Sequence, residues 1–298
     1  MTPTVFWPTL LGVSFLAAGV VTYGRDVRTV ASRDAFGLVV LGPAFVAAAL
    51  AAFAGEHFSA AASLATLVPK WLPARLFIAY FVGVAHFAAA LSFVARRYMR
   101  WSTIGLALMF GLFVLLMDLP AAIARPAIPI NWILVARQAT FAIGALALFA
   151  TETNSGSPQT SRTLATLARI WTAGVLAFYG IEHLIHPEHA PGVPSPVLTA
   201  AWVPFPLVIS YATGCLLVAL GTTMFVRKYA RAAAALGGLL MLVLTLALYV
   251  PAFFVAANVQ LRIRAINFIF DTLLFAGTLL VISKAISDTE SPPITGSR

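Results

Sequence analysis

The chain has 298 residues, of which 61% are hydrophobic and 10% are charged, and its mean hydropathy is +0.94. A soluble domain cannot cover its surface with so few polar residues, so the composition excludes a soluble globular protein and indicates a bilayer-embedded one. We assign the net charge of +9 to topology and anionic lipid and expect no nucleic-acid partner. The single cysteine, Cys215, excludes an intramolecular disulfide or a Cys-x-x-Cys redox pair.

Nine apolar stretches are long enough to cross about 30 Å of hydrocarbon as helices. They lie near residues 5–23, 36–58, 75–95, 101–119, 132–150, 168–186, 205–226, 231–250 and 263–286. The short alternating segments typical of transmembrane strands are absent from the sequence. We therefore predict an all-α polytopic membrane protein with about nine transmembrane helices.

The sequence after the first span contains the same pattern twice. Its motifs are Glu56-His57, Trp71-Leu72-Pro73, Tyr80-x-x-Gly83, Leu119-Pro120 and Arg137, which recur as Glu182-His183, Trp202-Val203-Pro204, Tyr211-x-x-Gly214, Val250-Pro251 and Arg264. The offset is 131 residues from tryptophan to proline, 126 at Glu-His and 127 at the arginine. This predicts two four-helix repeats, which face the same way because four spans are an even number.

The repeat divides the chain into five parts. They are an extra N-terminal transmembrane helix with a basic cytoplasmic loop (1–34), the first repeat (35–151), a cytoplasmic linker (152–162), the second repeat (163–286) and a disordered cytoplasmic tail (287–298). The first span has no basic residues before it, which favours a retained helix over a signal peptide.

The distribution of basic residues predicts the orientation. With the N-terminus outside and the C-terminus in the cytoplasm, 13 of the 19 lysines and arginines lie on the cytoplasmic side. We therefore expect a multi-pass protein of a bacterial inner membrane.

Ionisable residues inside these spans are the first candidates for a site, because a charge in hydrocarbon costs several kcal/mol unless it is paired or faces water. The ligand-binding candidates are Glu56, His57, Trp71, Asp118, Arg137, Glu182, His183, Trp202, Tyr249, Arg264 and Asp271. We expect one outward-facing polar cup per copy, with Glu56 paired to Arg137 and Glu182 to Arg264. The alternatives are helix ends that simply reach water and ion pairs that only fix the fold.

The two copies differ at their acids. Asp271 stands where the first copy has Gly144, and Asp118 is matched by Tyr249. Asp271 lies two turns beyond Arg264, on the same face of a helix and about 10 Å deeper. This predicts that Asp271 faces the interior of the second repeat and that the second copy holds the functional site.

Tryptophans and histidines leave further alternatives open. Trp71 and Trp202 are either interfacial anchors or lids whose indoles cover a flat ligand. His183, His186 and His189 have a loose metal-ligand spacing that the first copy lacks, so we expect no metal there. We interpret His86, in the middle of a span, as a hydrogen-bonded packing residue.

The motifs resemble the DoxX-like membrane proteins, most closely over Arg169–Pro251. The shared features are the helix that ends in Glu-His, the Trp-x-Pro loop, the Tyr-x-x-Gly helix, the helix that ends at proline and the last helix, which begins with arginine. The resemblance implies a four-helix bundle per copy and association with quinone-linked redox complexes. Duplication departs from the single-unit pattern of the family, and no catalytic residue is transferred.

The expected function is that of a binding or accessory subunit in a quinone-linked redox system, with a redox enzyme on the outer side as a partner. The arginines would hold a quinone and the Glu-His pairs would exchange its protons. The alternatives are a transporter of a small anion or lipid through the repeat interface, a structural or assembly protein, and an enzyme acting alone through a Glu-His pair.

Overall fold

The computed structural model describes residues 2–31, 37–152 and 157–290. Within these ranges nine helices are long and apolar enough to cross a membrane, which confirms the predicted all-α polytopic fold. The helices are α1 (Pro3–Ala31), α2 (Gly42–Ser59), α3 (Ala61–Leu64), α4 (Arg75–Ala95), α5 (Met99–Phe113), α6 (Leu119–Ala124), α7 (Pro129–Glu152), α8 (Pro158–Ile185), α9 (Pro206–Phe225), α10 (Arg227–Leu244), α11 (Val250–Val255) and α12 (Val259–Glu290). A 3₁₀ turn, η1 (Gly37–Leu41), precedes α2, and two π turns are described below.

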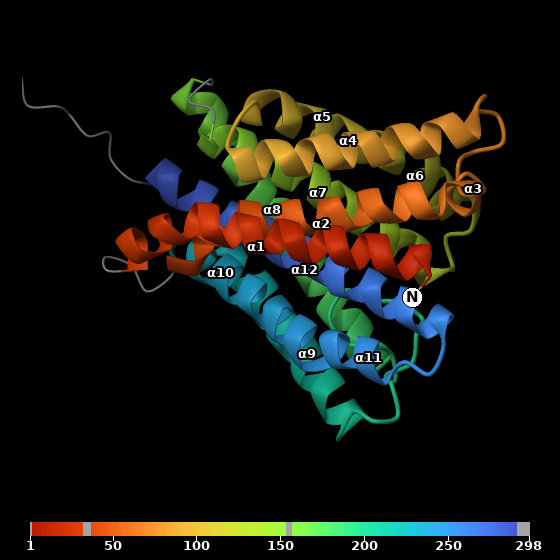
Figure 1. The fold of residues 1–298 in the computed structure, drawn as a ribbon. Helices are drawn as coiled ribbons and strands as arrows, with labels where there is room; N and C mark the ends of the chain where they lie inside the picture. Colours follow the sequence, from red (N-terminus) through yellow and green to blue (C-terminus); the bar gives the residue numbers. More distant parts are fainter. Residues whose placement is uncertain (1, 32–36, 153–156, 291–298) are drawn as a thin grey trace, which may run out of the picture.

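The long helices lie side by side with their ends at two faces (Figure 1). We call the end of the bundle at which α1 begins the N-terminal face; the loops that follow α2 and α8 lie there. The central positions belong to α2 and α12, in which 83% and 78% of the most apolar stretch is buried. For α5 the share is 17%. The lipid-facing surface is thus formed by the outer helices, while α2 and α12 hold them together.

The first and last helices of the two copies interlock. The first helix of the first copy, α2, packs along α12 of the second copy, and α8 of the second copy packs along α7 of the first. Gly42 and Gly277 let α2 and α12 approach closely, since a Cβ on Gly42 would lie 3.0 Å from the Gly277 carbonyl oxygen. The copies therefore share one core.

Each copy has a π turn shortly before a proline, at matching positions. Val114–Asp118 and Thr245–Tyr249 are π-helical, and Pro120 and Pro251 follow them in α6 and α11. Proline cannot donate to the carbonyl four residues earlier, and a wider turn accommodates the missing bond. The predicted helix ends at these prolines are wrong because both helices continue for one more turn. The two π turns are 131 residues apart, as are the sequence motifs.

The glycine of each Tyr-x-x-Gly motif lies at a helix crossing. Gly83 of α4 faces His57 and Phe58 of α2, where an added Cβ would be within 3 Å of both side chains. Gly214 of α9 crosses α8 at Gly180, and a Cβ on Gly180 would lie 2.6 Å from the Gly214 carbonyl oxygen. These glycines are needed for close backbone packing.

Two predicted connecting segments are partly helical. Helix α8 begins at Pro158, where the Ser157 side chain accepts a hydrogen bond from the Thr160 backbone, so the end of the predicted linker is helical. Helix α12 extends to Glu290, beyond the predicted start of the tail. The remainder of these two segments, 153–156 and 291–298, lies outside the described residues.

The crossing of α8 and α9 provides a test of the packing. We expect Gly180→Ala to lower the free energy of unfolding by about 1–3 kcal/mol, because the new methyl group meets the α9 backbone. Gly174→Ala, in the same helix but with open space at its Cβ, should be neutral or stabilise by up to about 1 kcal/mol. Thermal unfolding in detergent measures both, and equal effects would contradict the close crossing.

Candidate functional site

A partly buried ion pair joins the two copies. Arg137 of α7 donates from Nη1 to the Asp271 carboxylate of α12 at 2.7 Å, and their side chains are 25% and 16% exposed. Such a pair neutralises two charges that apolar surroundings would otherwise exclude. Asp271 is therefore paired across the boundary between the copies, and its partner belongs to the first copy.

Other polar side chains extend this pair into a cluster. Glu56 of α2 lies near Asn267 and Asp271 of α12. Asp118, the last residue of the first π turn, is coupled to Arg137. The Arg137 guanidinium thus has one carboxyl group from each copy near it, Asp118 and Asp271.

The predicted pairs within each copy are wrong. Arg137 bonds to Asp271 and not to Glu56, and Arg264 is exposed with no ion pair to Glu182 among the described residues. Helix α7 begins at Pro129 and α12 at Val259, so Arg137 is the ninth residue of its helix and Arg264 the sixth of its own. Three residues correspond to roughly 4.5 Å along the axis. Arg264 therefore lies nearer the N-terminal face than Arg137 and does not reach the core.

A large cavity lies in the first copy, between α4 and α5. Its volume is about 760 Å³, within the range of small-molecule sites. Its walls are mostly apolar and include Phe81 of α4 and Trp101, Met109 and Leu112 of α5. On α5 and its π turn the lining runs from residue 101 to residue 118, a length of about 25 Å at 1.5 Å per residue. The cavity is therefore a groove that follows most of the membrane thickness.

The groove is polar at its N-terminal-face end, where His57, Asp118 and Gln138 line it. The Nδ1 of His57 donates to the Ala79 carbonyl at 2.7 Å, which leaves Nε2 of the neutral ring as an acceptor. The Oδ2 atom of Asp118 is buried and has no hydrogen-bond partner among the described residues. Buried polar atoms are normally paired, so an unpaired carboxylate oxygen in a cavity wall indicates a place for a donor group.

His86 lies behind the polar end and makes no hydrogen bond with the described residues, so its interpretation as a hydrogen-bonded residue is wrong. Its ring packs edge-on against His57, with centroids 5.5 Å apart, and lies between Phe53 and Phe110. Aromatic packing fixes this imidazole and supports that of His57.

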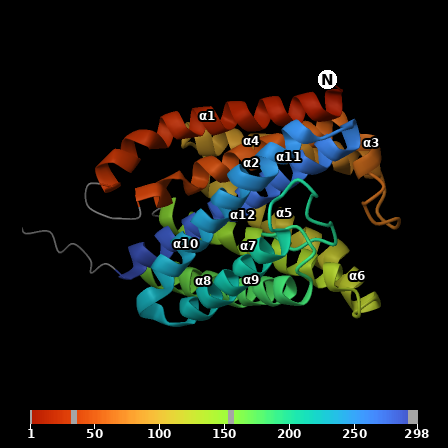
Figure 2. The same ribbon diagram turned by 90° about the horizontal axis from the view of Figure 1, so that it is seen from below.

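The corresponding place in the second copy is filled by its own loop. Gly192, in the loop between α8 and α9, donates its backbone N–H to Nε2 of His183 at 3.1 Å (teal loop in Figure 2). The Tyr249 hydroxyl donates to the Pro191 carbonyl, and its ring stacks on Phe268 with centroids 4.9 Å apart. Since His183 and Tyr249 are the counterparts of His57 and Asp118, the loop occupies the place where the first copy has its cavity. The open groove thus lies in the first copy, whereas the functional site is expected from the sequence in the second.

Neither predicted tryptophan lid lines the cavity. Trp71 is 67% exposed and Trp202 is 40% exposed. The cavity is lined instead by sequence neighbours of Trp71 in the loop before α4, among them Val68, Pro69 and Leu72. The exposure of the two tryptophans is typical of aromatic side chains at a membrane interface.

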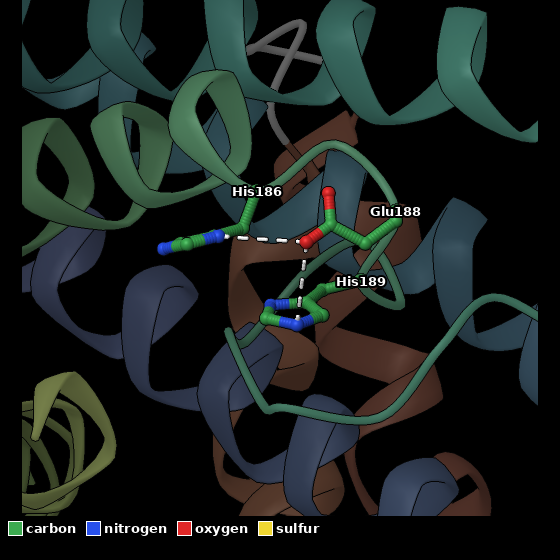
Figure 3. Close-up of side chains that lie close together, drawn as sticks. All are labelled: His186, Glu188 and His189. Atoms are coloured by element: carbon green, nitrogen blue, oxygen red, sulfur yellow. Dashed lines mark ion pairs between the residues drawn. The ribbon is translucent and has the colours of Figure 1, made fainter.

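The three histidines that have a loose metal-ligand spacing in the sequence do not come together. His183 is buried and bonded to Gly192, whereas His186 and His189 face the Glu188 carboxylate (Figure 3). A hydrogen bond from its own backbone amide, together with the two imidazoles, holds the pKa of the Glu188 carboxyl below its usual range. Glu188 is therefore an anion at neutral pH. The side chains that come together are His186, Glu188 and His189, without His183.

Sequence reasoning missed Gln138 and Glu188. Gln138 lines the groove next to the recognised Arg137, and an amide inside an apolar span was the available signal. Glu188 lies between His186 and His189 in the sequence, but only the folded loop turns its carboxylate toward both rings.

No family model, curated protein or solved structure matches the chain. The resemblance to DoxX-like proteins therefore stays a prediction.

The ion pair between the copies can be tested by a double-mutant cycle. Arg137→Gln should lower the free energy of unfolding by about 3–5 kcal/mol, because it leaves Asp271 buried without its partner. Adding Asp271→Asn should recover part of that loss, so the two effects are strongly non-additive. Arg264→Gln, on an exposed arginine of α12, is the control and should change stability by less than about 0.5 kcal/mol. Additive effects would contradict the pairing.

Proposed function

We propose that the chain binds a membrane quinol in the groove between α4 and α5, as an accessory subunit of a quinone-linked redox system. The observation that supports this is the groove itself: it is long and mostly apolar, and its ionisable groups lie at one end only, with the Ser102 hydroxyl at the other. This shape suits an isoprenoid tail that lies along the membrane normal and a ring at the end near His57 and Asp118.

The chemistry of the polar end favours a head group that donates hydrogen bonds. His57 offers Nε2 and Asp118 offers an unpaired carboxylate oxygen. The nearby guanidinium of Arg137 is bonded through Nη1 to Asp271, so its charge is neutralised, and its buried Nε has no hydrogen-bond partner among the described residues. The two hydroxyl groups of a quinol complement these acceptors, whereas a phosphate head group would meet the acidic side chain of Asp118.

On this proposal the protein handles protons and a partner handles electrons. Oxidation of a quinol to a quinone releases two protons and two electrons. His57 and Asp118 would accept the protons at the end of the groove, and the electrons would pass to a redox enzyme bound at the N-terminal face. The Glu-His pair thus keeps its proposed proton role only through His57, while Glu56 belongs to the neighbouring cluster.

The alternatives fit the geometry less well. At the junction of α2, α7 and α12 the described residues leave a cavity of only about 20 Å³, room for about one water, which does not suit anion passage between the repeats. A lipid transporter would share the long groove, but it would need polar groups along its length, and here the ionisable groups gather at one end. Quinol binding uses both the length of the groove and the ionisable groups at its end.

Filling the groove tests the proposal. Gly105 lines the groove on α5 and has open space at its Cβ, so Gly105→Phe should enter the groove without a backbone clash. Purified wild-type protein in detergent should be stabilised by a short-chain quinol, by about 2.7 kcal/mol at 100 times its Kd, and Gly105→Phe should lose this shift. Gly111→Phe is the matched control, since Gly111 is in the same helix, has the same open space and does not line the groove.

Variants of the polar end separate quinol binding from simple lipid filling. Asp118→Leu should weaken quinol binding by about tenfold or more, the loss of one hydrogen bond to a charged group. Binding of a phospholipid with the same tail length should change little. No quinol-dependent stabilisation of the wild type, or equal binding by Gly105→Phe, would overturn the proposal.

We further propose a bacterial inner membrane with the N-terminal face outside. In a Cys215→Ser background, a cysteine at Ser63 in α3 should react with an impermeant thiol reagent applied to intact cells. A cysteine at Ser157, the N-cap of α8 at the opposite end, should react only after the membrane is opened. Labelling of position 157 in intact cells would contradict this orientation.

A further inference from the structure

The loop that follows α8 begins with a compact group of potential metal ligands. His186 Nδ1 lies 3.5 Å from a Glu188 carboxylate oxygen, and His189 Nε2 lies 3.7 Å from the same oxygen (Figure 3). All three ligand atoms lie within 4.8 Å of one another. The three side chains are partly exposed, so an ion from solution can reach them.

These separations are close to those of ligands around one zinc ion. With Zn–N and Zn–O bonds of roughly 2.0–2.2 Å in a tetrahedron, neighbouring ligand atoms are about 3.3–3.6 Å apart. Two histidines and one carboxylate form a ligand set that zinc uses, with a water molecule in the fourth position. Small side-chain rotations would bring all three atoms to bonding distance.

The backbone holds the ligands in place before any ion binds. Ala190 donates its N–H to the Val197 carbonyl at 2.7 Å, and Thr199 donates its N–H to the Glu188 carbonyl at 2.9 Å. The Thr199 hydroxyl donates to the His189 carbonyl at 3.0 Å, next to an antiparallel bridge between His189 and Leu198. His186 is fixed from the other side, because it ends α8. Pre-organisation of this kind reduces the entropy cost of binding.

We infer that His186, Glu188 and His189 form a binding site for a divalent transition metal of the zinc class. The ion would tie the end of α8 to the loop whose Pro191 and Gly192 fill the second copy. It would thereby hold that segment in place against His183 and Tyr249. This role is structural and independent of quinol binding in the first copy.

The experiment uses tag-free, full-length protein in detergent, treated with a chelator and then titrated with zinc chloride. We expect one zinc ion per chain by calorimetry and by elemental analysis. Loss of an outer-shell partner already weakens metal binding roughly 10- to 100-fold, so His189→Gln, which removes a direct ligand, should weaken it by about 100-fold or more. Cobalt should give the visible absorption of a tetrahedral site in the wild type only.

Glu182→Gln is the matched control for Glu188→Gln. Both glutamates lie at the end of α8 or just after it, but Glu182 is outside the ligand group. Zinc binding that survives Glu182→Gln and is lost in Glu188→Gln and His189→Gln, with unchanged melting temperatures of the metal-free proteins, supports the site. Absence of stoichiometric zinc in the wild type, or zinc binding that persists in His189→Gln, overturns it.

Discussion

The ion pair between Arg137 and Asp271 determines how the two copies are assembled. Both charges lie deep within apolar helices, where neither is stable without the other. Because one residue is on α7 and the other on α12, the pair forms only when the last helices of both copies meet in the centre. The interlocked core of α2, α7, α8 and α12 follows from this meeting, and the remaining helices pack around it.

Duplication has produced two versions of one site. In the first copy His57 and Asp118 line an open groove, whereas in the second copy His183 and Tyr249 bond to the backbone of Pro191 and Gly192. In the second copy, the backbone of the longer loop thus makes hydrogen bonds with the two side chains. In the first copy, a ligand would make the equivalent bonds. A donor meets the histidine in the second copy, and this is the contact that a quinol hydroxyl would make with His57.

The sequence predicts the spans well and the site only in part. Span positions follow from apolar length, which a bilayer imposes directly. The residues of the polar cluster are visible because charges in spans are costly, but their partners are not. A difference of three residues between the positions of Arg137 and Arg264 in their helices changes which carboxylate each can reach. The groove is a space between α4 and α5 that their side chains do not fill, and it becomes visible only when the two helices are packed together.

The position of polar groups at one end of the groove also determines what the groove can select. Lipid tails are as apolar as the walls formed by Phe81, Met109 and Leu112, so moving an isoprenoid tail from lipid into the groove gains little hydrophobic free energy. The tail is aligned by the shape of the groove, and discrimination must come from hydrogen bonds at the head. In apolar surroundings an unpaired acceptor such as Asp118 Oδ2 is costly. A ligand that donates to it relieves that cost, and one that cannot leaves the cost in place.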